Sequence, residues 1–133
     1  MPISNGSGGF QVGDGNLNSA ILFPQGDPTA LTAGATVTAA QLVSGLFTFN
    51  GTAGNMVLPT VALLEAELPS VQKPNVAFDF YVINIDAAGS DAITVAVGAG
   101  WTLVGAGAVA VNTSAHFRAR KTGDGAWTCY RIS

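Results

Sequence analysis

Few residues in this sequence have side chains suited to acid–base or nucleophilic catalysis. The chain has one histidine, His116, and one cysteine, Cys129. A serine nucleophile needs a base and a sharp turn that presents it, and the sequence has no Gly-x-Ser-x-Gly motif. His116 lies among alternating apolar and basic residues typical of a strand, so we interpret it as a surface or interface side chain. Cys129 lies on another predicted strand, and we interpret it as a small packing residue.

The carboxylates and glycine-rich runs predict no further chemistry. Glu65 and Glu67 are two positions apart on a predicted helix, so their side chains diverge by about 200° and cannot act as a pair. Residues 13–16 and 86–91 supply loop oxygens, but neither run has the ligand number of a calcium loop, and turn formation explains both. The glycines of 98–100 precede a strand, whereas phosphate cradles precede a helix. We therefore predict no catalytic, metal or cofactor site.

The one charged feature that we interpret is a row of basic residues near the C-terminus. Period-2 alternation places His116, Arg118 and Arg120 on the outward face of a strand, with small and aromatic residues between them facing inward. The row is either a solvated strand face or a set of partners for carboxylates such as Asp79 or Asp124, on this chain or on a neighbouring copy. The subunit-interface candidates are therefore His116, Arg118, Arg120 and Asp79.

The composition suits a protein that assembles with other proteins. Hydrophobic residues make up 48% of the 133 residues and charged residues only 10%, against roughly 25% charged in an average soluble domain. Much of the surface must then be small polar and apolar side chains. Large apolar exposure usually marks an interaction site, so assembly is favoured over a bland β-rich monomer.

The pattern along the chain predicts an all-β fold. β-branched and aromatic runs bounded by turn formers predict roughly eight short strands, and Thr60 caps the only good helix, 61–68, which ends at Pro69. A single helical turn is also predicted between Thr38 and Gly45. The expected fold is a jelly-roll-like barrel or sandwich with one short helix. The strand-like runs, nine when the three-residue run 56–58 is counted, are 35–39, 46–50, 56–58, 76–85, 92–97, 101–104, 108–112, 115–120 and 127–132.

Two Val-Gly-Ala-Gly runs, 97–100 and 104–107, form an apparent internal repeat. A repeat that occurs only twice is too short to predict a solenoid. Two successive hairpin corners explain it better, because glycine favours such corners.

The first 28 residues differ from the rest and predict an extended N-terminal arm before a β-barrel domain over 29–133. The arm is rich in glycine and asparagine, yet it contains apolar residues that a wholly disordered tail seldom carries. The arm either lies across a neighbour or a larger surface, or folds back on its own domain. The apolar residues predicted to make this contact are Phe10, Val12, Ile21, Leu22 and Phe23.

Several partner classes are not expected. The net charge of −3 and the few basic residues argue against nucleic acid, which needs a basic surface. No apolar run approaches the roughly 20 residues of a membrane-spanning helix, and the start lacks the pattern of a signal peptide. We therefore expect synthesis in a cytoplasm without secretion.

Five segments carry a resemblance to a known kind of protein: residues 58–64, 78–84, 100–105, 117–123 and 127–132. Together they resemble a C-terminal module of small structural proteins of tailed bacteriophages, which include head-decoration, head-fibre and tail-associated proteins. The start of the chain, 8–17, is also similar to such virion proteins, less specifically.

The resemblance implies a β-rich, often trimeric virion protein without enzymatic activity or cofactor. The expected function is that of a capsid decoration (cement) protein that binds the major capsid protein, with the apolar arm residues as its predicted capsid contacts, and reinforces the assembled head. The alternative is a head-fibre or tail-fibre component that binds a host glycan, with Trp101, Trp127 and Tyr130 stacking on sugar rings if they are exposed. Burial of these aromatics in the core or a trimer interface is favoured, because large aromatics bury a large area.

Overall fold

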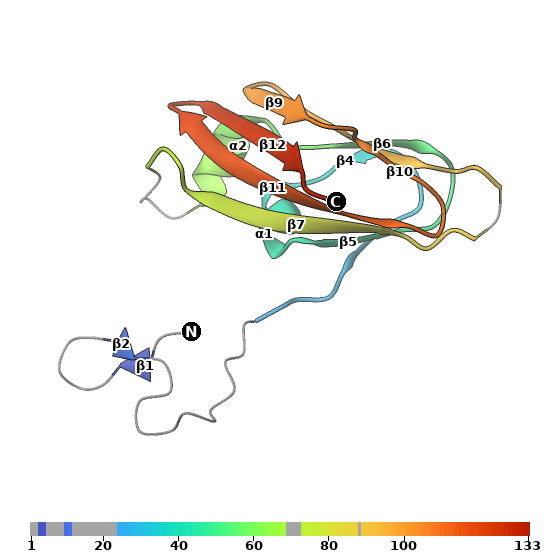
Figure 1. Ribbon diagram of the computed structural model, residues 1–133, viewed down its shortest axis with the longest axis horizontal. Helices are drawn as coiled ribbons and strands as arrows, with labels where there is room; N and C mark the ends of the chain where they lie inside the picture. The colour runs from blue at the N-terminus through green and yellow to red at the C-terminus, as the bar shows by residue number, and fades with distance from the viewer. Residues whose placement is uncertain (1–2, 5–9, 12–23, 69–72, 88) are drawn as a thin grey trace.

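The computed structural model describes residues 3–4, 10–11, 24–68, 73–87 and 89–133. From residue 29 onward, two β-sheets face each other with a shared apolar core between them (Figure 1). The prediction of a β-rich fold is confirmed in the form of a two-sheet sandwich. Before residue 24, the structure describes only β1 (Ile3–Ser4) and β2 (Phe10–Gln11), which pair antiparallel.

The larger sheet has six strands and the smaller sheet has four. In spatial order the larger sheet contains β3 (Thr29–Leu31), β5 (Leu46–Phe49), β7 (Ala77–Asn84), β11 (Ser114–Gly123), β12 (Ala126–Arg131) and β9 (Trp101–Val104). The smaller sheet contains β10 (Ala108–Val109), β8 (Ile93–Ala96), β6 (Gly54–Val57) and β4 (Ala35–Thr36).

From β3 to β8 the chain winds as a three-turn coil. Each turn places one strand in the larger sheet and the next in the smaller sheet. Consecutive turns therefore stack as parallel neighbours: β3 on β5 on β7 in one sheet, and β4 on β6 on β8 in the other. The stacked corners require glycine, because a Cβ on Gly51 would overlap the carbonyl oxygen of Thr32.

The remaining strands close the coil by antiparallel pairing. β10 pairs with β8, and β11 pairs with β7 over seven residue pairs from Ser114–Ile83 to Arg120–Ala77. β12 returns as a hairpin on β11, and β9 adds a parallel edge strand to β12. The last turn of the coil thus gains antiparallel neighbours in both sheets.

Mixed sheets differ from the antiparallel strands of a jelly roll, so the predicted jelly-roll topology is not confirmed. The predicted hairpin corners at 97–100 and 104–107 are also wrong. Residues 97–100 connect β8 to β9, and 104–107 lead from β9 to β10; in both cases the two strands lie in different sheets. These glycine-rich segments are crossings between sheets.

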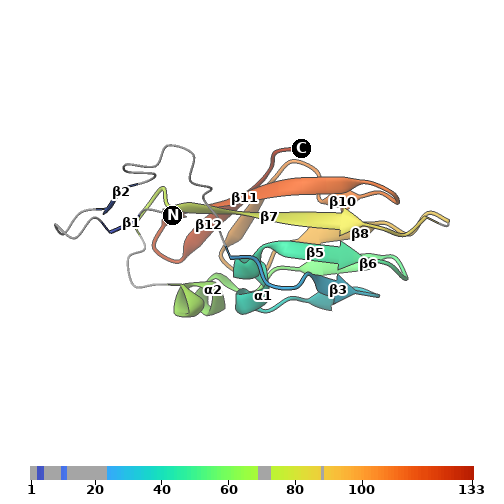
Figure 2. The same cartoon turned by 90° about the horizontal axis from the view of Figure 1, so that it is seen from below.

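Two short helices lie at one end of the sandwich, where the coil crosses from the smaller sheet to the larger one (Figure 2). α1 (Ala39–Ser44) connects β4 to β5, and α2 (Val61–Glu67) connects β6 to β7. The predicted caps are confirmed: Thr38 and Thr60 accept hydrogen bonds from the amides of the first turns, and Gly45 ends α1 at a φ of 85°. No helix in the described part of the chain has the length and apolarity to cross a membrane.

The core lies between the sheets and is closed at one end by the helices. Four phenylalanines of the larger sheet face aliphatic residues of the smaller sheet, and Phe80 stacks on Phe117 with ring centroids 5.2 Å apart. Burial of this apolar surface is the main source of stability. The fully buried residues include Phe47, Phe49, Phe80, Phe117, Met56, Ile93, Leu42 and Leu64.

Candidate functional site

The outward face of the larger sheet brings three of the four predicted interface residues together. β7 and β11 are adjacent and antiparallel, and their register places Arg118 opposite Asp79 and His116 opposite Tyr81. The predicted orientation is confirmed: Phe117 and Ala119 are buried, whereas the side chains between them face outward. Asp79, His116 and Arg118 form what we call the outward charge cluster.

Asp79 is the centre of the outward charge cluster. Arg118 donates two hydrogen bonds to it, from Nε to Oδ1 at 2.7 Å and from Nη2 to Oδ2 at 3.2 Å. The Nε2 atom of His116 lies 3.2 Å from Oδ2, an ion-pair distance when the imidazole is protonated. The Arg118 guanidinium, helped by His116, holds the pKa of Asp79 below its ordinary value. The carboxylate is therefore ionised and held in one orientation.

Tyr81 extends the outward charge cluster with an aromatic surface. Its ring stacks on the ring of His116 with centroids 4.6 Å apart and planes 19° apart. Tyr81 is 46% exposed, so a large part of its side chain faces solvent. The stack orients His116 toward Asp79 and adds an apolar contact area beside the charges.

Arg120, the fourth predicted candidate, has different partners. Its Nη1 donates to Asn75 Oδ1 at 2.7 Å and its Nη2 to the Tyr130 hydroxyl at 2.8 Å. The guanidinium carbon lies 5.7 Å from the centre of the Tyr130 ring, a cation–π distance. The predicted row therefore divides: His116 and Arg118 contact Asp79, whereas Arg120 fastens the segment before β7 to β12.

Exposed apolar side chains flank this face. Tyr130 of β12 lies opposite Val104 of β9, and Ile132 follows β12 with a backbone hydrogen bond to His116. Ile132 and Val104 are 53% and 48% exposed. Arginine, tyrosine and aliphatic side chains thus occupy one continuous face, a composition typical of protein–protein interfaces.

The tryptophans are not available for stacking on a sugar. Trp127 is 1% exposed and Trp101 is 8% exposed, and the Trp101 indole nitrogen donates to the carbonyl of Pro59 at 2.8 Å. Their rings lie 6.0 Å apart within the core. The favoured expectation is burial in the core or in a trimer interface, and the structure shows both tryptophans in the core. Of the three aromatics named for glycan binding, only Tyr130 is partly exposed, and it lies beneath Arg120.

Sequence reasoning missed the second ion pair of β11. The Nζ of Lys121 donates to Glu65 Oε2 at 2.7 Å, and this contact ties α2 to β11. Lys121 is only 5% exposed. The Lys121 ammonium lowers the pKa of Glu65 below its ordinary value. The alternation that places 117 and 119 inward also places Lys121 inward, so its burial could have been predicted, although its partner could not.

The other residues considered for chemistry have structural roles. Cys129 is buried, and burial raises the pKa of its thiol to about 12, as expected for a packing residue. Asp91 accepts a hydrogen bond from the amide of Ala53, and Asn84 accepts one from the amide of Asp86. Among the described residues, no three His, Cys, Asp or Glu side chains gather closely enough to hold a metal ion. Residues 13–16 lie outside the described part.

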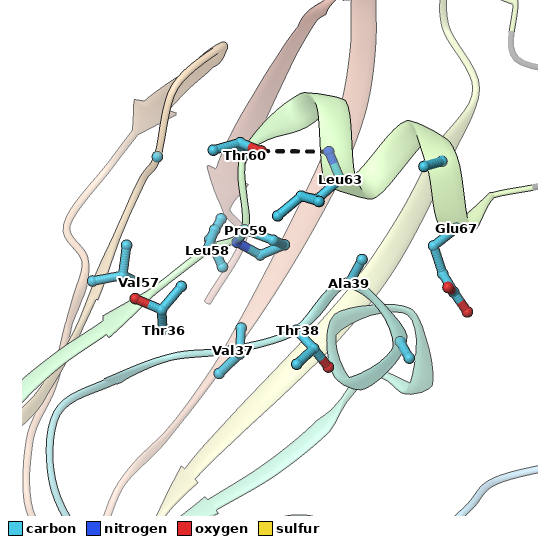
Figure 3. A pocket seen from close by; sticks show the side chains of 13 residues that line it. Thr36, Val37, Thr38, Ala39, Val57, Leu58, Pro59, Thr60, Leu63 and Glu67 are labelled. Carbon is cyan, nitrogen blue, oxygen red and sulfur yellow. Dashed lines mark hydrogen bonds between the residues drawn. The ribbon is translucent and has the colours of Figure 1, made fainter.

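An apolar groove of about 740 Å³ lies between the two helices. Its walls come from the start of α1, including Ala39 and Ala40, and from the exposed side of α2, including Leu63 (Figure 3). The buried Val37 and Leu58 also line it. No sequence pattern pointed to this groove, because its walls come from two turns of the coil.

The predicted arm residues are for the most part outside the described structure. Val12, Ile21, Leu22 and Phe23 are not described. Phe10 lies on β2, where it pairs with Ser4. Their expected contact with a capsid stays a prediction.

Comparison of the chain with known protein families, with curated proteins and with solved structures finds no match in any of the three.

Proposed function

We propose that this protein is a non-catalytic virion component, a capsid decoration protein that binds the assembled head of a tailed bacteriophage as a homotrimer. The observation that carries the binding role is the outward face of the larger sheet, where the outward charge cluster lies among exposed apolar residues. The resemblance of the five segments to phage structural proteins supplies the biological setting.

The outward charge cluster is suited to fixing the orientation of a protein partner. Asp79 takes two of the five N–H donors of Arg118, and the Arg118 side chain is 51% exposed. The remaining N–H donors are free to bind a carboxylate or carbonyl oxygen of a partner. Because Asp79 already fixes the guanidinium, this binding orders the Arg118 side chain no further. Such charge complementarity contributes specificity more than strength.

The apolar residues around the cluster supply the area that a stable contact needs. Tyr81, Val104 and Ile132 are each about half exposed, so their burial by a partner removes apolar surface from water. A weak contact between each subunit and the shell is sufficient for tight binding of the whole trimer. Three subunits that bind several shell proteins together gain effective concentration, which raises the overall affinity.

The test replaces one apolar residue of this face. Ile132→Asp is expected to convert the trimer to monomer, or to weaken occupancy on phage heads assembled without the protein. Native mass spectrometry reads the first effect and cryo-electron microscopy of the heads reads the second. Val43→Asp is the matched control, because Val43 is 42% exposed on α1 and is not part of the larger sheet.

Two results would overturn the proposal. One is a wild-type protein that is monomeric and leaves the heads bare. The other is Ile132→Asp protein that assembles and binds heads as well as the Val43→Asp control. Binding on a glycan array without binding to heads would replace the proposal with the fibre alternative.

A further inference from the structure

The groove between α1 and α2 takes no part in the proposed function, so the proposed function does not explain what binds there. Its lining is mostly apolar, and Glu67 at the end of α2 is its one charged side chain among the described residues. Leu63 is 61% exposed, the largest exposure among the large hydrophobic residues described. In Figure 3, Leu63 and Glu67 extend from α2 on the side that faces α1. An exposed leucine on an apolar hollow suits a short apolar peptide segment.

We propose that this groove binds residues 20–23 of the same chain, Ala-Ile-Leu-Phe. These residues form the only run of four consecutive apolar residues before residue 24. The inference goes beyond the proposed function. It assigns Ile21, Leu22 and Phe23 to the protein's own domain, and it leaves Phe10 and Val12 for contact with the shell.

The chain is fastened close to the groove immediately after this segment. The side-chain amide of Gln25 donates to the carbonyl of Ser44 at 3.0 Å, at the end of α1. α1 has six residues, so its first turn lies about 9 Å away at about 1.5 Å per residue. An extended chain covers about 3.3 Å per residue, so three or four residues before Gln25 span that distance. Residues 20–23 are therefore within reach of Ala39 and Ala40 in the groove wall.

The short tether favours the protein's own segment over a free partner. A segment held a few residues from its site has an effective concentration on the order of millimolar, so a modest intrinsic affinity is sufficient. The chemistry also matches, because residues 20–23 carry no charge that would be buried in an apolar groove. An acidic partner would additionally be repelled by Glu67.

The experiment measures the distance between the segment and the groove in the full chain. Spin labels are attached to Ser19→Cys and to Ala62→Cys, an exposed position of α2 that does not line the groove, and pulsed electron resonance reads their separation. Cys129 stays in place, because its buried thiol is not expected to react in the native protein. We expect one narrow distance population, which persists when labelled protein is diluted tenfold with unlabelled protein.

Matched substitutions test whether the groove is the cause. Leu63→Asp should abolish the narrow population, because the carboxylate places a charge in the groove wall at a position exposed enough to leave the fold intact. Val43→Asp should leave the narrow population unchanged, because Val43 does not line the groove. Leu22→Ser with Phe23→Ser should abolish it, whereas Val12→Ser should not.

Three outcomes would overturn the inference. A broad distance distribution in the unmodified background means that the segment does not dock. A narrow population that disappears on dilution means that the segment binds a neighbouring copy. A narrow population that survives Leu63→Asp means that the segment binds elsewhere. None of these readouts depends on trimer formation or head binding, so this inference and the proposed function fail separately.

Discussion

Arg118 and Lys121 lie three residues apart on β11, and their ion pairs have opposite surroundings. Arg118 pairs with Asp79 on the outward face, where its side chain is 51% exposed. Lys121 pairs with Glu65 on the inward face, where its side chain is 6% exposed. The carboxylates are similarly exposed, 28% for Asp79 and 23% for Glu65, so the difference lies in the cations: water competes at the Arg118 guanidinium and is largely excluded from the Lys121 ammonium. The same strand therefore carries one pair suited to recognition and one on which the fold depends.

The inward pair joins elements that are distant in sequence. Glu65 belongs to α2 in the second corner of the coil, and Lys121 belongs to the hairpin that closes the sheet. A buried ion pair adds little stability over apolar residues of the same shape, but removal of one partner leaves a charge without compensation. The two pairs should consequently differ far more under single substitution than their similar distances suggest.

The largest expected effect follows from Lys121→Met. The substitution keeps the length of the side chain but leaves the Glu65 carboxylate without its cation, so we expect the free energy of unfolding to fall by about 2–4 kcal/mol. We place the loss toward the lower part of the usual range because the Glu65 side chain is 23% exposed. Urea unfolding followed by tryptophan fluorescence measures it. Lys73→Met, at an exposed position, is the control, and equal stability of the two variants would contradict the prediction.

Cys129 offers an independent measure of the same effect. Burial and a thiol pKa raised to about 12 leave almost no reactive thiolate, so labelling requires opening of the sheet. If Lys121→Met destabilises by about 2–4 kcal/mol, the labelling rate should rise by about 30- to 900-fold. Mass spectrometry after timed exposure to a thiol reagent reads the rate. Rapid labelling of the unmodified protein would show that Cys129 is accessible without opening.

Acid is expected to weaken both pairs. The pKa of Glu65 and the pKa of Asp79 lie below their ordinary values of 4.5 and 3.8, chiefly because of Lys121 and Arg118 respectively. A carboxylate with a lowered folded-state pKa stabilises the fold above its unfolded pKa, and the contribution is lost as the pH falls through the folded value.

The free energy of unfolding should therefore fall as the pH drops from about 5 toward 3. Glu65→Gln and Asp79→Asn should each flatten the profile, because neither amide titrates. Urea unfolding at a series of pH values measures the profiles. Identical pH profiles for wild type and both variants would contradict this prediction.

The outward face was largely predictable from sequence, and the physical reason is local. Strict alternation from Ala115 to Arg120 and the glycine-rich turn after it determine which side chains face outward. The caps of the two helices at Thr38 and Thr60 were predictable for the same reason, because a cap depends on neighbouring residues.

The parallel coil was not predictable from the sequence. Its contacts join residues that are far apart in the sequence, and no repeat in the sequence marks them. Phe47 pairs with Thr29 on one side and with Val82 on the other, separations of 18 and 35 residues. Such unequal spacing leaves no periodic pattern in the sequence. The partner of Lys121 and the groove between the helices depend on this coil, so they were missed with it.

The smallest expected effect on stability follows from Arg118→Gln. Asp79 keeps contact with solvent and with His116, so the loss of the guanidinium should change urea unfolding no more than the exposed control Lys73→Gln. Trimer formation or head occupancy should fall instead, because the cation presented to a partner is gone. Native mass spectrometry and particle occupancy measure this second quantity. If Arg118→Gln destabilises the fold as much as Lys121→Met, it is wrong that only the inward ion pair supports the stability of the fold. If it changes neither stability nor assembly, the outward charge cluster is a solvated strand face, and partner recognition must depend on the apolar residues alone.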